Sequence, residues 1–394
     1  MKKLYFILLL SILCIKADAQ WQYTNGPSYG LVNSLGIIDT TVVAGTIDWG
    51  IYTSTFNGTT WSVANMDSSC DIDMVSFGTK GADIYAGTMT GGVIKSLNMG
   101  MNWTASNAGL PSHQVNCFAI NGTGIFIGTD WGGMFESTNN GASWTAMNTG
   151  LTDTLVRALV FNDTDIFAGT YQDVNNRGGI FLSTNYGMNW TEMDTGLIYK
   201  NVTSLTVCGT NIFAGTSGGI YLSSNNGRSW TAVNNGLTDT SITSLVVSGT
   251  NIFAGSPIGG VFFSNNNGSN WTAINSGLTN LQVEALAIGG NYLFAGTFGG
   301  GVFKCPLADF VGINEINKHD YKLSIYPNPV ANNLTIVAPQ SAVIEITNIQ
   351  GQLIKTFTTT GNKTNIDVSA FASGVYIVQV RTSQGVEVRK FIKE

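Results

Sequence analysis

Short turns carry the side chains of this chain that are best suited to holding a ligand. Two of these turns contain the tripeptide Asp-Trp-Gly, which begins at Asp48 and again at Asp130. An indole on an exposed turn stacks on a sugar ring or anchors a peptide, and a neighbouring carboxylate supplies a hydrogen-bond acceptor for the same ligand. The alternative is that both indoles only fill space between adjacent loops. We treat Asp48, Trp49, Asp130 and Trp131 as candidate ligand-binding residues.

Two further turns at corresponding places differ from the short, Gly-rich ones. One of them, over 171–177, is longer by about five residues, and another contains Phe298. Because turns on a rigid scaffold are where binding residues gather, Tyr171, Asp173, Arg177 and Phe298 join the candidates. Catalytic residues stay unassigned, since no pair stands out among the 17 acidic residues between 20 and 312. A glycoside hydrolase that uses two carboxylates from separate parts of the chain therefore remains an alternative.

Charge and metal-ligand patterns narrow the classes of ligand. Residues 20–312 contain 7 basic and 17 acidic side chains, so a nucleic-acid partner is disfavoured. Neither a metal nor a cofactor is predicted, since no calcium-type Asp-x-Asp-x-Asp-Gly loop is present and His113 and His319 stand alone. A cation such as calcium at the rim is the alternative. The absence of Cys-x-x-Cys spacing argues against zinc. Buried free thiols are expected instead, although an exported chain permits disulfides; the cysteines concerned are Cys70, Cys117, Cys208 and Cys305.

The elements that position these turns repeat with a period of about 41 residues. An apolar run ends in Ala-Gly-Thr or a near copy seven times, with steps of 42, 41, 41, 46, 40 and 41 residues. Seven tryptophans form a second series, with steps of 40, 42, 41, 46, 40 and 41 residues. Trp21 precedes every Ala-Gly-Thr run, and the last such run, at Ala295, has no tryptophan of the series after it. The N-terminal strand is therefore predicted to complete the last repeat and close a ring.

Each repeat contains about four strand-like runs separated by Gly- and Asn-rich turns. Four short antiparallel strands per repeat are typical of a propeller blade, and seven blades lie within the usual range. The predicted fold class is all-β, with a seven-bladed β-propeller over residues 20–312 that is closed by the strand around Trp21 beside residues 283–304. The glycines of Ala-Gly-Thr are expected where neighbouring sheets approach closely.

Five repeats share the turn Ser-x-Asn-x-Gly-x-x-Trp, for example from Ser137 to Trp144. We expect the asparagine to bond amides of its own turn and the tryptophan to bury its ring. This pattern resembles the Asp-box of sialidase-like and photosystem II assembly-factor-like propellers, with Asn in the Asp position. The resemblance implies a structural turn on the face opposite the active site. A sialidase is disfavoured, because Arg-Ile-Pro is missing and only Arg157 and Arg177 of the propeller arginines lie outside such turns.

The two ends of the chain have different patterns. Lys2, Lys3, an apolar run and a small-residue site ending at Ala19 predict a signal peptide over 1–19. The alternative is a lipoprotein anchored at Cys14, which lacks the small residue expected before it. After a polar linker over 313–320, residues 321–394 alternate as a small β-sandwich of about seven strands, with an exposed basic tail.

The C-terminal segment resembles a type IX secretion system C-terminal sorting domain of type A. The similarity lies in Tyr-Pro-Asn-Pro at 326–329, in 349–353, in Ser-Gly-Val-Tyr at 373–376 and in the basic end at 389–393. It implies an Ig-like β-sandwich, outer-membrane export directed by this domain, its removal, and attachment to surface lipopolysaccharide. An accessory binding sandwich is the alternative. The sorting-signal residues that the resemblance implies are Pro327, Asn328, Pro329, Gly374, Tyr376, Lys390 and Lys393.

These patterns together predict an exported propeller, secreted or held at the cell surface, with no transmembrane segment in the mature chain. The leading hypothesis is a non-catalytic module that binds a glycan or a protein at the propeller rim and engages the type IX secretion machinery through residues 321–394. A glycoside hydrolase with carboxylates in the central funnel is the second hypothesis. A passive surface scaffold is the third.

Overall fold

A computed structural model describes most of the chain after the N-terminal twenty residues. The described residues are 21–27, 30–55, 58–67, 70–111, 114–122, 124–171, 177–310, 324–338, 342–348, 352–359, 361, 363–382 and 385–394. Contacts divide the chain into two compact units, Met1–Phe310 and Val311–Glu394. Cys14, the predicted signal peptide over 1–19 and the predicted linker over 313–320 lie outside the described residues.

The described part of the first unit forms seven sheets of mainly antiparallel strands. In six of them the chain runs outward from the innermost strand, and the seventh takes its outermost strand from the N-terminus. The innermost strands are β2 (Leu31–Ile38), β7 (Met74–Lys80), β11 (Val115–Asn121), β15 (Val156–Asn162), β19 (Val202–Cys208), β23 (Ser244–Ser248) and β27 (Val283–Gly289). The second strands are β3 (Thr41–Ile47), β8 (Asp83–Thr88), β12 (Gly124–Thr129), β16 (Asp165–Thr170), β20 (Asn211–Thr216), β24 (Asn251–Ser256) and β28 (Tyr292–Thr297).

The third and fourth strands of each sheet are shorter. The third strands are β4 (Ile51–Thr55), β9 (Val93–Ser96), β13 (Gly133–Ser137), β17 (Gly179–Ser183), β21 (Gly219–Ser223), β25 (Gly260–Ser264) and β29 (Gly301–Pro306). The outermost strands are β5 (Ser62–Val63), β10 (Asn102–Ala105), β14 (Thr145–Ala146), β18 (Thr191–Glu192), β22 (Thr231–Ala232), β26 (Thr272–Ala273) and β1 (Gln22–Tyr23). One sheet carries a fifth strand, β6 (Asn65–Met66), which pairs in parallel with β10.

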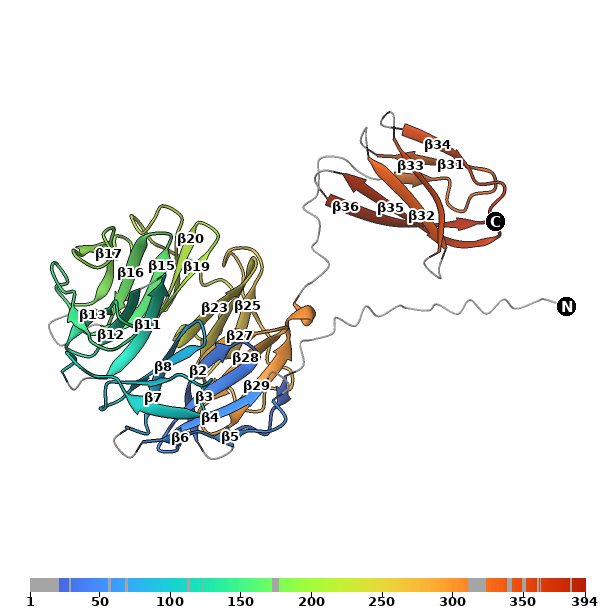
Figure 1. Ribbon diagram of the computed structural model, residues 1–394. Coiled ribbons are helices and arrows are strands. Elements are labelled where there is room, and N and C mark those ends of the chain that lie inside the picture. The colour runs from blue at the N-terminus through green and yellow to red at the C-terminus, as the bar shows by residue number, and fades with distance from the viewer. Residues whose placement is uncertain are drawn as a thin grey trace. The chain divides into compact units, whose positions relative to one another are not determined.

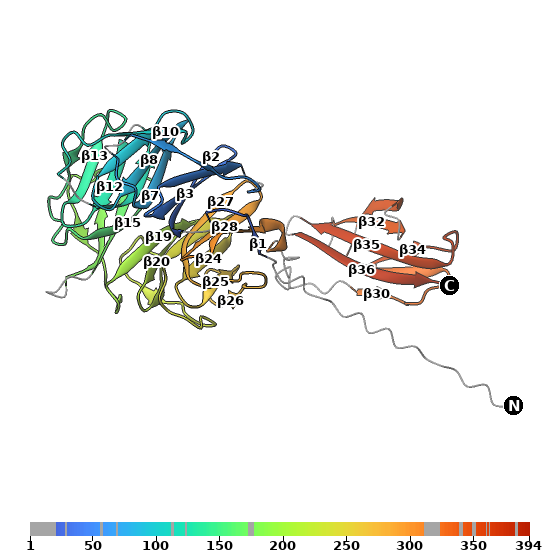
Figure 2. The same ribbon diagram turned by 90° about the horizontal axis from the view of Figure 1, so that it is seen from below.

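The sheets close into a ring, as the offset between the two repeat series predicts. Strand β1 pairs antiparallel with β29, with Gln22 opposite Lys304 and Tyr23 opposite Phe303. Each innermost strand contacts the innermost strand of the next sheet, and β27 contacts β2, so that the circle is complete (Figures 1 and 2). The fold is therefore an all-β propeller of seven blades, closed by its N-terminal strand.

Glycine in the Ala-Gly-Thr strands allows the next blade to approach. A Cβ atom at Gly128 would lie 2.4 Å from a methyl group of Val156, and one at Gly169 would lie 2.4 Å from a methyl group of Val202. Each of these valines starts the innermost strand of the following sheet. After their first residue, the second strands are buried between the neighbouring sheets, which is why those positions hold small or apolar residues.

The periodic tryptophans do more than bury a ring in their own hairpin. Six of the seven are at least 96% buried, as expected, and Trp61 is half-buried. The indole N–H of Trp144 donates to the carbonyl of Ser106 at 2.8 Å, and that of Trp190 donates to Met147 at 2.8 Å. Both acceptors follow the outermost strand of the preceding sheet. Six of the seven indoles bond to the preceding blade in this way, whereas that of Trp103 donates to Gly100 in its own turn. Sequence reasoning confined to the hairpin did not anticipate these bonds between blades.

The second unit is a sandwich of two sheets. Strands β30 (Ser324–Tyr326), β31 (Asn333–Val337) and β34 (Lys363–Asp367) form one sheet. Strands β33 (Leu353–Thr358), β32 (Val343–Asn348), β35 (Gly374–Thr382) and β36 (Gly385–Lys393) form the other. Its core is mainly aliphatic, with residues such as Ile336, Ile344 and Val378, and also contains the aromatic rings of Tyr376 and Phe391.

The expected basic tail at the C-terminus is exposed at Arg389 and Lys390, but it is not a free tail. The terminal residues form β36, which pairs with β35 along its whole length, so the tail is an edge strand of the sandwich. Lys390 is exposed, but Lys393 is only 8% exposed, since alternate side chains of a strand point to opposite faces.

Candidate binding face

The strand order places the connecting turns on two opposite faces of the ring. The turns between second and third strands lie at the same end as the connections between sheets, and we call this end the rim face. The turns between first and second strands and between third and fourth strands lie at the other end, the staple face. Among the described residues, the rim turns are 48–50, 89–92, 130–132, 171 with 177–178, 217–218, 257–259 and 298–300. The described connections are 24–27 with 30, 64–67 with 70–73, 106–111 with 114, 147–155, 193–201, 233–243 and 274–282.

The staple face contains the repeated Ser-x-Asn-x-Gly turn, and its hydrogen bonds are local. In the turn that starts at Ser137, the hydroxyl donates to Asn139 Oδ1 at 2.9 Å and accepts the amide of Gly141 at 2.8 Å. Asn139 Oδ1 also accepts the amide of Ser143 at 2.9 Å. The side chains of this turn are thus consumed in holding its backbone, which confirms the expected role of the asparagine.

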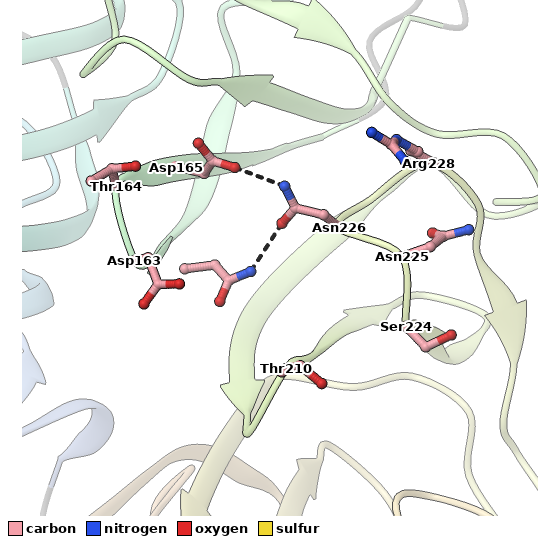
Figure 3. Close-up of a pocket in the computed structure, with 9 residues that line it drawn as sticks. Asp163, Thr164, Asp165, Thr210, Ser224, Asn225, Asn226 and Arg228 are labelled. Atoms are coloured by element: carbon pink, nitrogen blue, oxygen red, sulfur yellow. Dashed lines mark hydrogen bonds between the residues drawn. The ribbon is translucent and has the colours of Figure 1, made fainter.

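An open polar hollow of about 430 Å³ lies on the staple face between two blades (Figure 3). Its central side chain, Asn226, donates to Asp165 at 2.7 Å and accepts from Asn162 at 2.9 Å. These bonds tie the turn after β21 to the turn after β15, in the preceding blade. The polar side chains at the centre of this hollow are therefore hydrogen-bonded to one another, and these bonds connect the two blades.

The rim turns are braced by a motif that sequence reasoning missed. Asn148 Oδ1 accepts the amide of Met134 at 2.7 Å, and its Nδ2 donates to the carbonyl of Gly132 at 2.9 Å. The same clamp recurs at Asn107 and Asn275. Asn or Asp followed by x-Gly-Leu starts at 107, 148, 194, 234 and 275, at the spacing of the other two series, and this periodicity was the available signal.

The candidates Asp130 and Tyr171 meet around Arg157, a residue from the innermost strand of the next blade. Asp130 Oδ2 forms an ion pair with Arg157 at 3.2 Å, and its Oδ1 accepts from Asn116 at 2.8 Å. The guanidinium lies 5.6 Å from the centre of the Tyr171 ring. Sequence reasoning named Arg157 but gave it no role, because its partner is 27 residues away in another blade.

Backbone bulges direct Asn116 and Arg157 out of their ladders. The pairing register shifts between Val115 and Cys117 and again between Val156 and Ala158, so the residue between each pair stands outside the regular ladder. Bulges of this kind re-aim a side chain next to a binding site. Arg157 Nε is buried without a hydrogen-bond partner among the described atoms.

The two Asp-Trp-Gly tripeptides are not equivalent in space. The first begins two residues after Thr46, whereas the second begins directly after Thr129. Positive φ therefore falls on Asp48 (68°) in the first turn and on Trp131 (65°) in the second. A bulky residue in this region is strained by about 1–3 kcal/mol and is held there by its surroundings. The two identical tripeptides thus place their tryptophans at different positions of the turn.

The candidates form two groups on the rim face. Asp130, Trp131, Tyr171 and Arg177 belong to the blades that contain β12 and β16. Asp48, Trp49 and Phe298 belong to the blades that contain β3 and β28, where Phe298 forms a bridge with Leu31. The sheet with β8 separates the groups on one side of the ring. Asp173 lies outside the described residues.

Large exposed apolar side chains gather on the rim face. Among the described residues, nine belong to its turns and connections, against five on the staple face. The most exposed are Ile198 (78%), Ile258 (73%) and Trp131 (66%). The other six are Trp49, Ile72, Tyr171, Tyr199, Leu281 and Phe298.

Acidic side chains follow the same distribution. Eight acidic and two basic residues lie in the described turns and connections of the rim face, against two acidic and one basic in those of the staple face. The rim acids are Asp48, Asp67, Asp71, Asp73, Asp130, Asp153, Asp194 and Asp239, and the bases are Arg177 and Lys200.

The pKa values of two carboxyls on this face are shifted in opposite directions. Burial raises the pKa of Glu284, which lies at the bulge between Val283 and Ala285. Burial also acts to raise the pKa of Asp71, but hydrogen bonds from Thr90 and from the amides of Asp73 and Gly91 outweigh it and lower this pKa. Asp71 is therefore an ionised carboxylate that holds a rim turn.

Several of the residues predicted as the sorting signal form bonds and ring contacts within the sandwich. Asn328, in the turn that contains Pro327 and Pro329, accepts the amide of Ile392 at 2.8 Å and donates to the carbonyl of Lys390 at 3.2 Å. Tyr376 follows Gly374 in β35, stacks on Phe391 at 5.3 Å and donates to the carbonyl of Ala372. Lys393 donates to the carbonyl of Glu394.

Residues 324–394 match the model of a secretion system C-terminal sorting domain. The sorting domain indicates secretion to the cell surface or the extracellular space. In the described part of the chain, no helix has the length and apolar character needed to cross a membrane. The described residues also contain no group of three or more His, Cys, Asp or Glu side chains placed to hold a metal ion.

Solved structures with the same fold include surface and extracellular proteins. PorZ, a surface component of the type IX secretion system of Porphyromonas gingivalis, is 15% identical over 91% of this chain, with a TM-score of 0.56. The chain spans 59% of the length of PorZ. The extracellular domain of the hybrid two-component system BT3049 of B. thetaiotaomicron is 14% identical over 95% of this chain and 57% of its own, with a TM-score of 0.62.

YCF48 of Cyanidioschyzon merolae is similar over the propeller. It is 12% identical over 73% of this chain and 98% of its own length, with a TM-score of 0.55, and a structure of YCF48 bound to D1 peptide gives a TM-score of 0.58. No curated protein matches the sequence. At these identities the solved structures establish the propeller fold.

Proposed function

We propose that this protein is a non-catalytic binding module, exported through its sorting domain, that holds a glycan or a protein on the rim face of the propeller. The observation that carries the proposal is the gathering of exposed large apolar side chains on that face. Exposed apolar patches on soluble proteins mark sites of interaction, since leaving such surface in water is unfavourable.

The rim turns have the rigidity that a binding surface needs. The amide of Asp130 donates to Gln114, and that of Tyr171 donates to Leu155, so each turn is tied to the connection that precedes its own blade. Together with the asparagine clamps, these bonds order the turns before a ligand arrives, which reduces the entropy lost on binding. The positive φ of Trp131 is supported by the same bracing.

The hydrogen-bonding state of the rim carboxylates favours binding over hydrolysis. Asp71 accepts bonds from Thr90 and Gly91, and Asp130 is paired with Arg157. A hydrolase requires a carboxylate free to attack or to activate water. Paired carboxylates beside exposed rings are instead suited to recognition, as polar partners of a stacked ligand.

The solved relatives give independent support for a binding role. The structure of YCF48 with D1 peptide is a propeller of this fold with a peptide bound, and PorZ is a component of a bacterial surface. By extension, we propose that the two candidate groups, around Trp49 and around Trp131, contact the ligand.

The test is a double substitution, Trp49→Ala and Trp131→Ala, in the full chain, with binding measured on a glycan array and against surface proteins of the producing cells. Loss of a binding signal shown by the natural protein is expected. The matched control is Met99→Ala with Met188→Ala, which removes exposed apolar side chains from the staple face. Unchanged binding of every ligand found, in the tryptophan variant, would contradict the proposal.

A further inference from the structure

The rim face combines negative charge with apolar surface. Of its eight described acids, Asp130 and Asp194 are neutralised by ion pairs with Arg157 and Lys200. In all, eight acids stand against two bases, Arg177 and Lys200, in the described turns and connections of this face. The staple face, with two acids and one base in its described turns, has no comparable excess. The charge thus separates one end of the ring from the other.

Part of this charge is presented directly to solvent. Asp48 is exposed, and its amide donates to Asp73 Oδ1 at 2.6 Å. Asp71 Oδ1 in turn accepts the amide of Asp73 at 3.3 Å. Three carboxylates therefore lie in sequence beside Trp49, which is 56% exposed, and Ile72, which is 45% exposed. A ligand on this part of the rim meets negative charge and an apolar surface together.

The apolar side chains distinguish a protein from a glycan. Ile198 and Ile258 are the most exposed large apolar side chains on the rim, and Leu281 is 40% exposed. Branched aliphatic side chains offer no flat face on which a sugar ring can stack, whereas they pack well against the side chains of another protein. Aromatic and aliphatic groups spread over several blades also suit an extended chain better than a single sugar.

We propose that the rim face docks a basic protein segment that carries apolar side chains, with Lys or Arg facing the carboxylates around Asp48 and apolar residues on Trp49, Ile198 and Ile258. The inference rests on the proposed binding function and specifies the partner's chemistry. Charge complementarity identifies the occupant, since an acidic segment of equal apolar content would be repelled by the same face.

The probes are two synthetic peptides that share the same Leu and Trp positions and carry either Lys or Glu elsewhere. Binding to the full chain is measured by fluorescence anisotropy at low and at high salt. The Lys peptide is expected to bind more tightly than the Glu peptide, and its affinity is expected to fall as salt screens the charges. Equal affinity of the two peptides would overturn the inference.

Matched variants test whether the negative charges must lie on the rim face for the Lys peptide to bind. Asp48→Asn with Asp73→Asn keeps the shape and one acceptor oxygen of each side chain while removing its charge. It should weaken binding of the Lys peptide by about two- to tenfold, given the strength of exposed ion pairs. The control is Asp39→Asn with Asp163→Asn on the staple face, which removes the same charge at exposed positive-φ sites and should leave affinity unchanged. Equal effects of the two double variants would contradict docking at the rim.

A second pair tests the apolar contribution. Ile198→Ser with Ile258→Ser should weaken the Lys peptide, whereas Leu97→Ser with Met188→Ser, at similarly exposed staple-face positions, should not. If glycans bind through Trp49 and Trp131 while neither peptide binds, the basic-segment inference fails and the proposed function stands. If no peptide, glycan or surface protein binds the natural chain, both fail.

Discussion

Gly150 gives the sharpest test of how the blades are joined. It has φ = 83°, and a Cβ atom there would lie 2.3 Å from the carbonyl oxygen of Trp190 in the next blade. The substitution Gly150→Ala is therefore opposed twice, by the backbone angle and by contact with the backbone. Gly209→Ala is the matched control, because Gly209 has φ = 61° and nothing within 4 Å of the added atom.

The expected magnitudes follow from these two geometries. Both variants incur the cost of an alanine at positive φ, about 1–2 kcal/mol. Gly150→Ala must also move the strand of Trp190, which disturbs a 96%-buried ring and the 2.9 Å bond from its amide to Thr149. Forced overpacking costs about 1–3 kcal/mol and a lost hydrogen bond about 1 kcal/mol. Gly150→Ala should therefore be less stable than Gly209→Ala by about 2–4 kcal/mol.

Intrinsic tryptophan fluorescence during thermal unfolding of the full chain is the assay. All nine tryptophans precede residue 310, so the signal reports the propeller and not the sandwich. At about 2 °C per kcal/mol for a domain of this size, the Tm of Gly150→Ala should lie about 4–8 °C below that of Gly209→Ala. Equal Tm values for the two variants would refute the close approach between blades and, with it, the packing of each glycine against the next tryptophan strand.

Two more predictions concern a thiol and the sorting domain. Burial, with the nearby Asp309 carboxylate, raises the pKa of Cys305 to about 12, so alkylation at pH 8 should be about a thousandfold slower in the folded than in the unfolded chain, as read by peptide mass spectrometry. Because the unfolded thiol ionises first, Cys305 should also reduce stability as the pH rises from about 9 towards 12, and rapid labelling of the folded protein would exclude this. Asn328→Ala removes two bonds to β36 and should leave more protein inside the outer membrane, as measured by cell fractionation. Asn365→Ala, which removes one exposed bond, is its control, and equal retention of both variants would contradict a special role for Asn328.

The periodic residues made the architecture predictable. Each blade contributes one Ala-Gly-Thr run and one tryptophan of the series. The number of runs therefore gives the number of blades, and the offset between the two series shows that the N-terminal strand completes the last blade. The Ser-x-Asn-x-Gly turn was predictable for the same reason, because Ser137 and Asn139 bond only within a few residues of themselves. Local hydrogen bonds leave a local pattern.

The candidate binding face was predictable only in part. Sequence reasoning placed Trp49 and Trp131 on the turns opposite the staple face, and the structure does so. It treated their turns as equivalent, whereas the strand before Trp49 runs one residue further, to Ile47. The residue at which strand pairing ends depends on the partner strand, so it cannot be read from the tripeptide sequence alone.

By itself, the sequence determined the seven repeats, the closure by the N-terminal strand and the C-terminal sorting domain, because each depends on spacing along the chain or on a motif of adjacent residues. The tertiary structure alone decided that Asp130 is paired with Arg157, that six of the seven periodic tryptophans bond to the preceding blade and that acidic and apolar side chains share one end of the ring. These features join residues that are distant in sequence, and they exist only once neighbouring blades are packed together.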